Sequence, residues 1–492
     1  MVVSGGAPGI GKTRFGKDLF TYLEETWIPP EWTELNVLFE YLRMDFGNGI
    51  GLDKVDVMID NPDVVFGHRI AYCFFIEKKD STPSYYGSDG KRVSFGFVST
   101  PLLSFKSVLE IAGYYSGKYN AEKYDCDANR WKHCRHFLQL LMDTGGLPRA
   151  LELLFGVCFQ FGGDGEGFFR DIYKQNFDAI FERTKIGLER RYKIYKSVQA
   201  NRKLALMLLY ISTIGHPVER KTLMDPDDQH STIASLEQDT HIILDACDHS
   251  GTLFTVKMPL FFVCLYNDVL QLVDLELQDA LRERHGMHWR DWEMFVAYFE
   301  VFRSNLLLDL GHQTANLSEL YSGAFGTQAT IDLEVKLRRL SVREAKEQFP
   351  CQTLTDRGTA QPIHWERGDN VIVNGKSDAC GGVFIVRETV QGNMIIDSNL
   401  VEFTPDNLLV EHRKNLDSSG RVNLNPVFRL SLKPYRHITL VFTTQPFDVE
   451  DMERDTLVVS MNNFKDYFGP IFAPHASFAL ALGNPNFQSE PG

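Results

Sequence analysis

The residues from Gly6 to Thr13 read Gly-Ala-Pro-Gly-Ile-Gly-Lys-Thr, which matches the G-x-x-x-x-G-K-[ST] pattern of a phosphate-binding loop. Glycines let the backbone curl so that several N–H groups converge on one phosphate, and the following helix points its positive end at the same anion. Lys12 is expected to neutralise β- and γ-phosphate charge, and the Thr13 hydroxyl is expected to ligate Mg²⁺. The pattern therefore predicts that ATP or another nucleoside triphosphate binds, with Mg²⁺, at Gly6, Gly9, Ile10, Gly11, Lys12 and Thr13.

The residues on either side of this loop predict the elements that such a loop requires. Met1 to Val3 reads as the end of a buried strand, and Arg14 to Glu25 carries apolar residues at helical spacing. A central strand usually has about five residues, and the chain begins only two or three residues before the loop. We therefore expect either a truncated piece of a longer protein or the product of a gene copy that lost its front.

A second chemical feature is the turn Gly145-Gly146-Leu147-Pro148-Arg149, between a predicted helix over 135–142 and one that begins at Ala150. A similar turn opens the lid helices of AAA-like and STAND-like P-loop ATPases, where its Arg or Pro faces the nucleotide. Arg149 is therefore a predicted γ-phosphate sensor. The alternative is a surface arginine in an ordinary helix-loop-helix turn.

The sequence lacks the acidic strand motif that accompanies a phosphate-binding loop in ATPases. That motif is a run of four apolar residues followed by Asp, on a strand between the loop and the sensor. Residues 28–145 contain no such run. Without that carboxylate, Mg²⁺ and the attacking water lose their main protein anchor. We expect nucleotide binding, and the sequence leaves hydrolysis open.

The composition restricts the class of protein. A chain of 492 residues with 43% hydrophobic and 24% charged residues is typical of a soluble globular protein of two to four domains. No apolar run is long enough for a transmembrane helix, so no membrane partner is expected. The net charge of −14 argues against a general polyanion binder. Eight cysteines without a C-x-x-C pair predict free thiols in a reducing, intracellular setting.

Neither the Cys and His residues near position 130 nor a basic stretch further on gives strong evidence of a binding site. Cys126, His133, Cys134 and His136 fit no standard zinc spacing. The stretch 184–208 is rich in Lys and Arg, which fits either a nucleic-acid face or a solvated helix face, and the second interpretation is favoured.

The order of predicted elements divides the chain into modules. Residues 1–155 read as a P-loop NTPase-like domain with the start of its lid, and 156–285 as a helical or winged-helix-like connector. Residues 286–480 predict a helix over 289–310 and strands at 370–374, 383–387, 394–397 and 437–443. That order is typical of a restriction-endonuclease-like α/β core. Residues 481–492 read as a flexible tail, and the whole chain is predicted to be α/β.

The chain resembles the C-terminal effector region of Crinkler proteins and the related retrotransposon-hot-spot proteins, which pair a P-loop ATPase with a restriction-endonuclease-like nuclease. The resemblance covers nearly the whole chain, and the phosphate-binding loop is its one sharp motif. The other matching segments are specific in combination: Asp45–Gly49, Gly145–Glu152, Met258–Leu260, Leu265–Asn267, Trp292–Phe295, Arg303–Leu307, Tyr321–Gly326, Thr443–Pro446 and Tyr467–Pro470.

The resemblance implies a metal site in the nuclease core, and this chain departs from it. The family core carries an acid on its first helix, an Asp on one strand and [E/Q]-x-K on the next, which together hold Mg²⁺ and position the attacking water. Glu293 matches the helix acid and is the one predicted catalytic residue. The strand Asp is replaced near Gly382, and Val401 stands at the Lys position. Asp378 lies four residues too early. A shifted alignment through Asp397 and Glu402 restores carboxylates but still lacks the Lys.

These departures predict a degenerate Crinkler-like effector that binds a nucleotide, with hydrolysis in doubt and DNA cleavage lost. The alternative is an active, NTP- and Mg²⁺-dependent DNA nuclease acting in a host nucleus. The resemblance implies that the full-length parent is secreted and delivered to a host cell nucleus, where DNA or host nuclear proteins are its partners.

Overall fold

The computed structural model describes residues 2–5, 96–99, 102–120, 129–224, 231–239, 242–247, 252–273, 289–347, 353–375, 382–391, 394–401, 436–442, 455–460 and 462–483. The protein is mixed α/β and divides into two compact units, Met1–Pro101 and Leu102–Gly492. Among the described residues, no helix combines the length and the apolar character needed to cross a membrane.

Two short strands are described in the first unit. Strand β1 (Val2–Gly5) pairs in parallel with β2 (Gly96–Ser99), and Val2 lies opposite Gly96. Strand β1 overlaps the strand end that the sequence predicts at Met1 to Val3. A parallel pair requires a crossover connection, and the residues between the two strands lie outside the described ranges.

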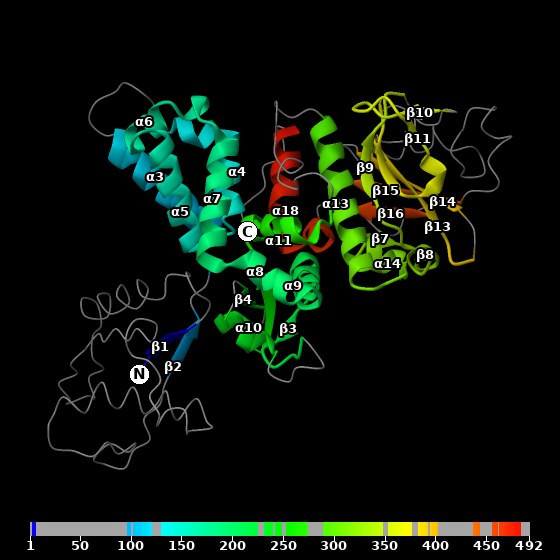
Figure 1. Ribbon diagram of the computed structural model, residues 1–492, viewed down its shortest axis with the longest axis horizontal. Helices are drawn as coiled ribbons and strands as arrows, with labels where there is room; N and C mark the ends of the chain where they lie inside the picture. Colours follow the sequence, from blue (N-terminus) through cyan, green and yellow to red (C-terminus); the bar gives the residue numbers. More distant parts are fainter. Residues whose placement is uncertain are drawn as a thin grey trace, which may run out of the picture. The chain divides into compact units, whose positions relative to one another are not determined.

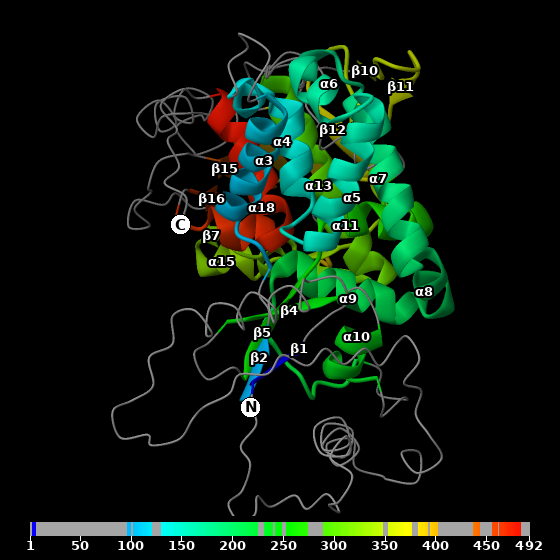
Figure 2. The ribbon, with the colours of Figure 1, turned by 90° about the vertical axis from the view of Figure 1, so that its left-hand side faces the viewer.

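The second unit begins with helices that pack around an aromatic core. Helices α5 and α7 lie side by side (Figure 2). Trp131, Phe137 and Phe168 are almost completely buried among these helices. The elements are α3 (Phe105–Asn120), η2 (Arg130–His133), α4 (Arg135–Asp143), α5 (Pro148–Phe161), α6 (Gly165–Arg170), η3 (Ile172–Lys174) and α7 (Phe177–Tyr192).

The start of α5 corrects the sequence prediction. The helix begins at Pro148 and not at Ala150, because proline has no N–H to lose at the first helical position and its fixed φ suits that position. Leu147, the residue before it, has an extended conformation with φ −72° and ψ 113°. This conformation is the one that a residue preceding proline favours.

A small three-stranded sheet follows the next two helices. Its strand order is β3-β5-β4, and both pairs are antiparallel. Helix α11 is buried on nearly all sides, as expected for a helix that is apolar all round. The elements are α8 (Ile194–Ala200), α9 (Arg202–Ile214), β3 (Val218–Glu219), α10 (Ile233–Asp239), β4 (Ile243–Ala246), β5 (Leu253–Lys257) and α11 (Leu260–Leu270).

The largest sheet has seven strands in the order β7-β16-β15-β14-β13-β12-β9. Strands β12, β13 and β14 form an antiparallel meander, and β15 then pairs in parallel with β14. The bounds are β7 (Phe325–Gly326), β9 (Ser341–Glu344), β12 (Asn370–Val373), β13 (Val383–Glu388), β14 (Met394–Val401), β15 (Arg436–Phe442) and β16 (Thr456–Val459). Central strands β12, β13 and β16 are buried almost throughout, as their continuous apolar runs predict.

Two long helices pack with this sheet. Helix α13 (Trp289–Asp309) runs against β9, β12 and β13 (Figure 1). Helix α18 (Phe464–Gly483) contacts α13, α9 and α4, and it kinks at Gly469, whose φ is +65°. A Cβ on Gly469 would lie 1.8 Å from the carbonyl oxygen of Thr213 in α9, so glycine allows both the turn and the close approach.

Short elements complete the edges of the second unit. They are β6 (Thr314–Asn316) with β8 (Glu334–Lys336), β10 (Leu354–Thr355) with β11 (Pro362–Ile363), α14 (Leu317–Leu320), α15 (Gln328–Ile331) and η4 (Trp365–Arg367).

Candidate functional site

The predicted nucleotide site is described only at its edge. Strand β1 ends at Gly5, and Gly6, Gly9, Ile10, Gly11, Lys12 and Thr13 lie outside the described residues. Asp378 and Glu402, which the sequence offers as replacement carboxylates for the nuclease site, also lie outside them.

Arg149 lies in the first turn of α5 and already has an acidic partner. Its Nη1 is 2.5 Å from Glu152 Oε2, and the Arg149 side chain is 36% exposed. Because Glu152 is three residues along the same helix and more exposed, this pair is the weak surface type. Arg149 is therefore accessible, and an anionic ligand would compete only with a solvated carboxylate.

The turn that carries Arg149 is held from two other segments. Gly145 and Gly146 have φ of +56° and +72°, and Leu103 N donates to Gly146 O at 2.9 Å. A Cβ on Gly146 would lie 2.0 Å from Leu103 O, and one on Gly145 would lie 3.0 Å from Pro259 Cα. The two glycines are thus required by conformation and by contact.

A buried ionisable pair lies directly before this turn. His475 Nε2 of α18 is 3.4 Å from Asp143 Oδ1 at the end of α4, and both side chains are at most 4% exposed. Burial lowers the pKa of His475 to about 4, because desolvation disfavours the imidazolium. His475 is therefore neutral at physiological pH, and its Nδ1 has no hydrogen-bond partner among the residues that the structure describes.

One corner of the large sheet brings together three positions that the sequence singles out. Glu293 of α13 is 7% exposed, and its side chain lies against Gly382, which directly precedes β13. A Cβ on Gly382 would lie 1.9 Å from Glu293 Oε1. The carboxylate of the helix acid therefore occupies the space that the side chain of a strand Asp would need.

Backbone register places the third position at the same corner. Val383 pairs with Asn399 in the antiparallel β13–β14 ladder, so the start of β13 lies beside the end of β14, where Val401 stands. Asp397 pairs with Ile385, two residues further into the sheet. The Gly382 carbonyl accepts a hydrogen bond of 2.7 Å from Asn374 N, which ties this corner to the end of β12.

Two of the three positions at this corner carry no metal ligand. Magnesium is held by oxygen ligands such as carboxylates, and the side chains of Gly382 and Val401 provide no oxygen. Within the described ranges, no group of three or more His, Cys, Asp or Glu side chains is placed to hold a metal ion.

The basic stretch 184–208 is only partly a solvated face. Lys185 is buried, and its Nζ lies 3.2 Å from Asp268 and 3.3 Å from Glu182. Arg202 pairs with Asp309 at 2.9 Å. These two cations link helices to one another. For the exposed rest of the stretch, a solvated helix face stays the favoured interpretation.

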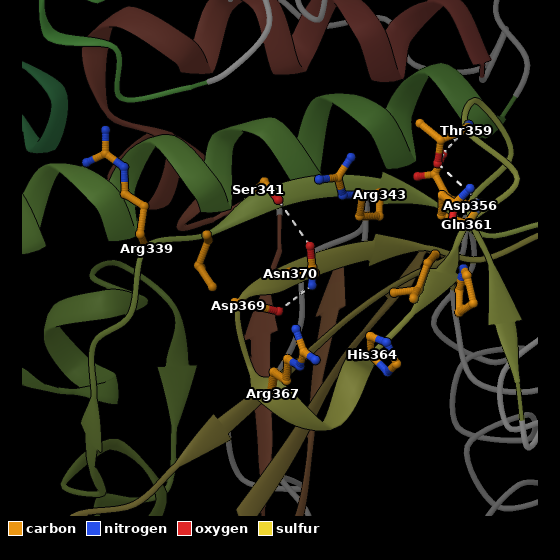
Figure 3. Close-up of a pocket in the computed structure, with 13 residues that line it drawn as sticks. Arg339, Ser341, Arg343, Asp356, Thr359, Gln361, His364, Arg367, Asp369 and Asn370 are labelled. Carbon is orange, nitrogen blue, oxygen red and sulfur yellow. Dashed lines mark hydrogen bonds between the residues drawn. The ribbon is translucent and has the colours of Figure 1, made fainter.

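A polar cavity of about 550 Å³ at the β9 edge of the large sheet is not anticipated by the sequence (Figure 3). It is lined by residues from the start of β9, the β10–β11 hairpin, η4 and the start of β12. Arg343, Arg367 and His364 are among its lining residues. These exposed polar residues lack apolar periodicity, so no sequence signal assembles them.

No protein-family model, curated protein or solved structure matches this chain. What the chain does must therefore be inferred from its own motifs and geometry.

Proposed function

We propose that this chain is a Crinkler-type effector module that binds ATP or another nucleoside triphosphate, with Mg²⁺, and that no longer cuts DNA. The observation that carries the second half is the corner at Gly382, where the Glu293 carboxylate fills the place of a strand Asp. The first half rests on the phosphate-binding loop from Gly6 to Thr13.

The strand order supports a nuclease-like ancestry. Helix α13 comes before the β12–β13–β14 meander, with the short elements β6 to β11, α14, α15 and η4 between them, and β15 then adds in parallel to β14. Apart from these short elements, the order is the helix, three strands and further strand on which the comparison with a restriction-endonuclease-like core rests. The three-stranded β3-β5-β4 sheet after α9 is likewise compatible with a winged-helix-like connector.

The chemistry of cleavage explains why its loss is proposed. Phosphodiester hydrolysis of this kind uses a metal held by carboxylates and a lysine that positions the attacking water. Of the three aligned positions Glu293, Gly382 and Val401, Glu293 alone matches that set, and its carboxylate is packed against backbone at Gly382. Glu293 is thus a former metal ligand whose side chain now packs against Gly382.

The nucleotide half is tested by calorimetric titration of MgATP and MgADP into the full chain, with a phosphate-release assay in parallel. Lys12→Ala is the control, because it removes the charge that would neutralise the β- and γ-phosphates. Arg149→Gln tests the sensor assignment: weaker MgATP binding with unchanged MgADP binding is expected. Binding that survives Lys12→Ala would refute the assignment of the loop.

The nuclease half is tested separately with plasmid and linear DNA in Mg²⁺ or Mn²⁺. No cleavage above the level of Glu293→Ala is expected. Metal-dependent cleavage that Glu293→Ala abolishes would refute the proposed loss and favour the active NTP-dependent nuclease. By resemblance, the host nucleus and its DNA or proteins remain the proposed setting.

A further inference from the structure

The cavity at the β9 edge is built by one contiguous segment of chain, and its walls are fixed. Ser341 Oγ is 3.0 Å from Asn370 Oδ1, across the paired starts of β9 and β12. Asp356 Oδ1 accepts hydrogen bonds from Thr359 N at 2.7 Å and from Thr359 Oγ1 at 2.9 Å, which closes the turn between β10 and β11. The site is therefore largely formed before any ligand arrives.

The short helix η4 forms the remaining wall, and its buried residue Trp365 anchors it. Trp365 is 5% exposed, so it holds the short helix in the core. Gly368 has φ +65°, and a Cβ there would lie 2.7 Å from Val386 O. This close approach sets the place of Arg367, which directly precedes the glycine.

The charges around the cavity are unequally engaged. Arg339 Nη1 is 2.6 Å from Asp309 Oδ1, so its charge is already compensated. Arg343 and Arg367 are both exposed, and within the described part of the chain neither guanidinium makes a hydrogen bond or a close salt bridge, although the charge of Arg343 acts on Asp356. Two arginines thus border the cavity with their donors available.

The two lining carboxylates have structural partners. Burial opposes ionisation of Asp356, but the hydrogen bonds from Thr359 and the nearby Arg343 outweigh it and hold its pKa below the usual value. Asp369 accepts a hydrogen bond from Asn370 Nδ2. The two carboxylates therefore make hydrogen bonds within the cavity walls, whereas the arginines keep N–H donors that are available to a ligand.

The two arginines lie at separate points of the cavity. Arg343 is in β9 opposite Ile372, whereas Arg367 precedes β12, and Figure 3 shows them on either side of Asn370. This placement suits a ligand that offers one anionic group to each guanidinium. Asn370 lies between them, and Ser341 and Gln361 line other parts of the cavity, so hydroxyl and amide groups suited to a sugar or base are also present.

We propose that this cavity binds a small organic ligand that carries two separated phosphate groups, of the nucleoside 3′,5′-bisphosphate class. Guanidinium groups match phosphate oxygens in geometry and charge. The volume of about 550 Å³ lies within the range of small-molecule sites, roughly 300–1,000 Å³. The site is distinct from the phosphate-binding loop, and the inference does not depend on nucleotide binding there.

The test is calorimetric titration of adenosine 3′,5′-bisphosphate, adenosine 5′-monophosphate and adenosine into the full chain. All titrations use the Lys12→Ala background, so that binding at the phosphate-binding loop does not contribute. Arg343→Gln and Arg367→Gln are the test variants. Arg338→Gln is the matched control, because Arg338 is also an exposed arginine of this segment but pairs with Glu388 at 2.9 Å and does not line the cavity.

Saturable binding of the bisphosphate is expected, with the monophosphate at least about tenfold weaker, since one charged hydrogen-bonded contact is worth that factor or more. Each test variant should reduce bisphosphate binding to the monophosphate level, and Arg338→Gln should leave it unchanged. No saturable binding, equal affinity for both phosphates, or equal effects of all three variants would overturn the proposal.

Discussion

The contact between Glu293 and Gly382 can be tested by adding a methyl group at the glycine. Gly382→Ala would place a methyl group 1.9 Å from Glu293 Oε1, 2.1 Å from Cδ and 2.4 Å from Cγ. Ordinary contact begins near 3.4 Å, so the buried carboxyl group would have to retreat by about 1.5 Å. The substitution is therefore expected to destabilise the protein, although Gly→Ala at an unstrained position is normally favourable.

The magnitude follows from two opposing effects. Overpacking in a well-packed region costs about 1–3 kcal/mol, whereas replacing glycine reduces the entropy of the unfolded chain and gains about 0.4–1 kcal/mol. A net loss of about 1–2 kcal/mol in the free energy of unfolding is expected. Because the three nearest atoms all belong to the Glu293 side chain beyond Cβ, Glu293→Ala removes every one of them.

A double-mutant cycle isolates this contact. In the Glu293→Ala background, Gly382→Ala should be neutral or stabilising, which gives a coupling free energy of about 2 kcal/mol. Urea unfolding of the four proteins, followed by circular dichroism and tryptophan fluorescence, measures it. Glu293→Gln keeps the shape and removes the charge, so Gly382→Ala should remain destabilising there. A cost for Gly382→Ala that is the same with and without the Glu293 side chain would refute the packing described here.

Three further substitutions have expected outcomes. Gly146→Ala should cost more than Gly163→Ala in urea unfolding, by about 1–3 kcal/mol, because both have positive φ and only Gly146 has an atom, at 2.0 Å, in the way. His475→Gln should flatten the pH dependence of stability between pH 6.5 and 4, measured by thermal unfolding. Arg303→Met should destabilise by about 3–5 kcal/mol, because it leaves Glu300, 3.4 Å from the guanidinium, buried without its cation.

The sign of the pH effect follows from proton uptake on unfolding. The pKa of His475 is about 4 in the folded protein and near 6.5 in the unfolded chain, so the unfolded state binds the extra proton in this window. The contribution of His475 is fully present above pH 6.5 and is lost as the pH falls toward 4, at about 1.4 kcal/mol per unit. An unchanged pH profile in His475→Gln would contradict this account.

The other two predictions have their own controls. Equal costs at Gly146 and Gly163 would mean that the conformation of the turn, and not the approach of Leu103, explains the glycine. Adding Glu300→Gln to Arg303→Met should recover much of the lost stability, because the uncompensated buried charge is then gone. If the double variant is as unstable as the single one, the cost lies in lost packing against the rings of Phe299, Tyr321 and Tyr467.

Elements with strong apolar periodicity could be predicted from the sequence. The helix expected over 289–310 is α13, and the expected strands at 370–374, 383–387 and 437–443 are β12, β13 and β15. The strand expected at 394–397 is longer and continues to Val401. Residues 398 and 399 pair with both β13 and β15, and residues 400 and 401 pair with β15, so tertiary pairing extends a strand that its own sequence marks only weakly.

The residues between α13 and β12 could not be predicted in the same way. Their strands have two to four residues, too few for a period to emerge, and β9 enters the sheet only by parallel pairing with β12. The cavity beside β9 depends on that pairing and on the close approach at Gly368. Neither Arg343 nor Arg367 is distinguished in the sequence from other exposed arginines.

The candidate site was predicted in part. Resemblance singled out Glu293, Gly382 and Val401, and the sheet register brings their backbone positions to one corner. The contact between a carboxylate and a glycine could not be foreseen, because it depends on how α13 lies on the sheet. The partner of Arg149 was foreseeable, since Glu152 follows at the i+3 spacing at which helix side chains meet.

The kinked helix α18 makes the second unit indivisible. Its Gly469 rests on the end of α9, its His475 reaches Asp143 at the end of α4, and its first turns pack on α13 beside the large sheet. If the protein were cut near residue 285, both fragments would expose apolar surface. Helix α18 packs on α4 and α9 before the cut and on α13 after it. One helix therefore joins the packing of the helical portion to the packing of the sheet portion.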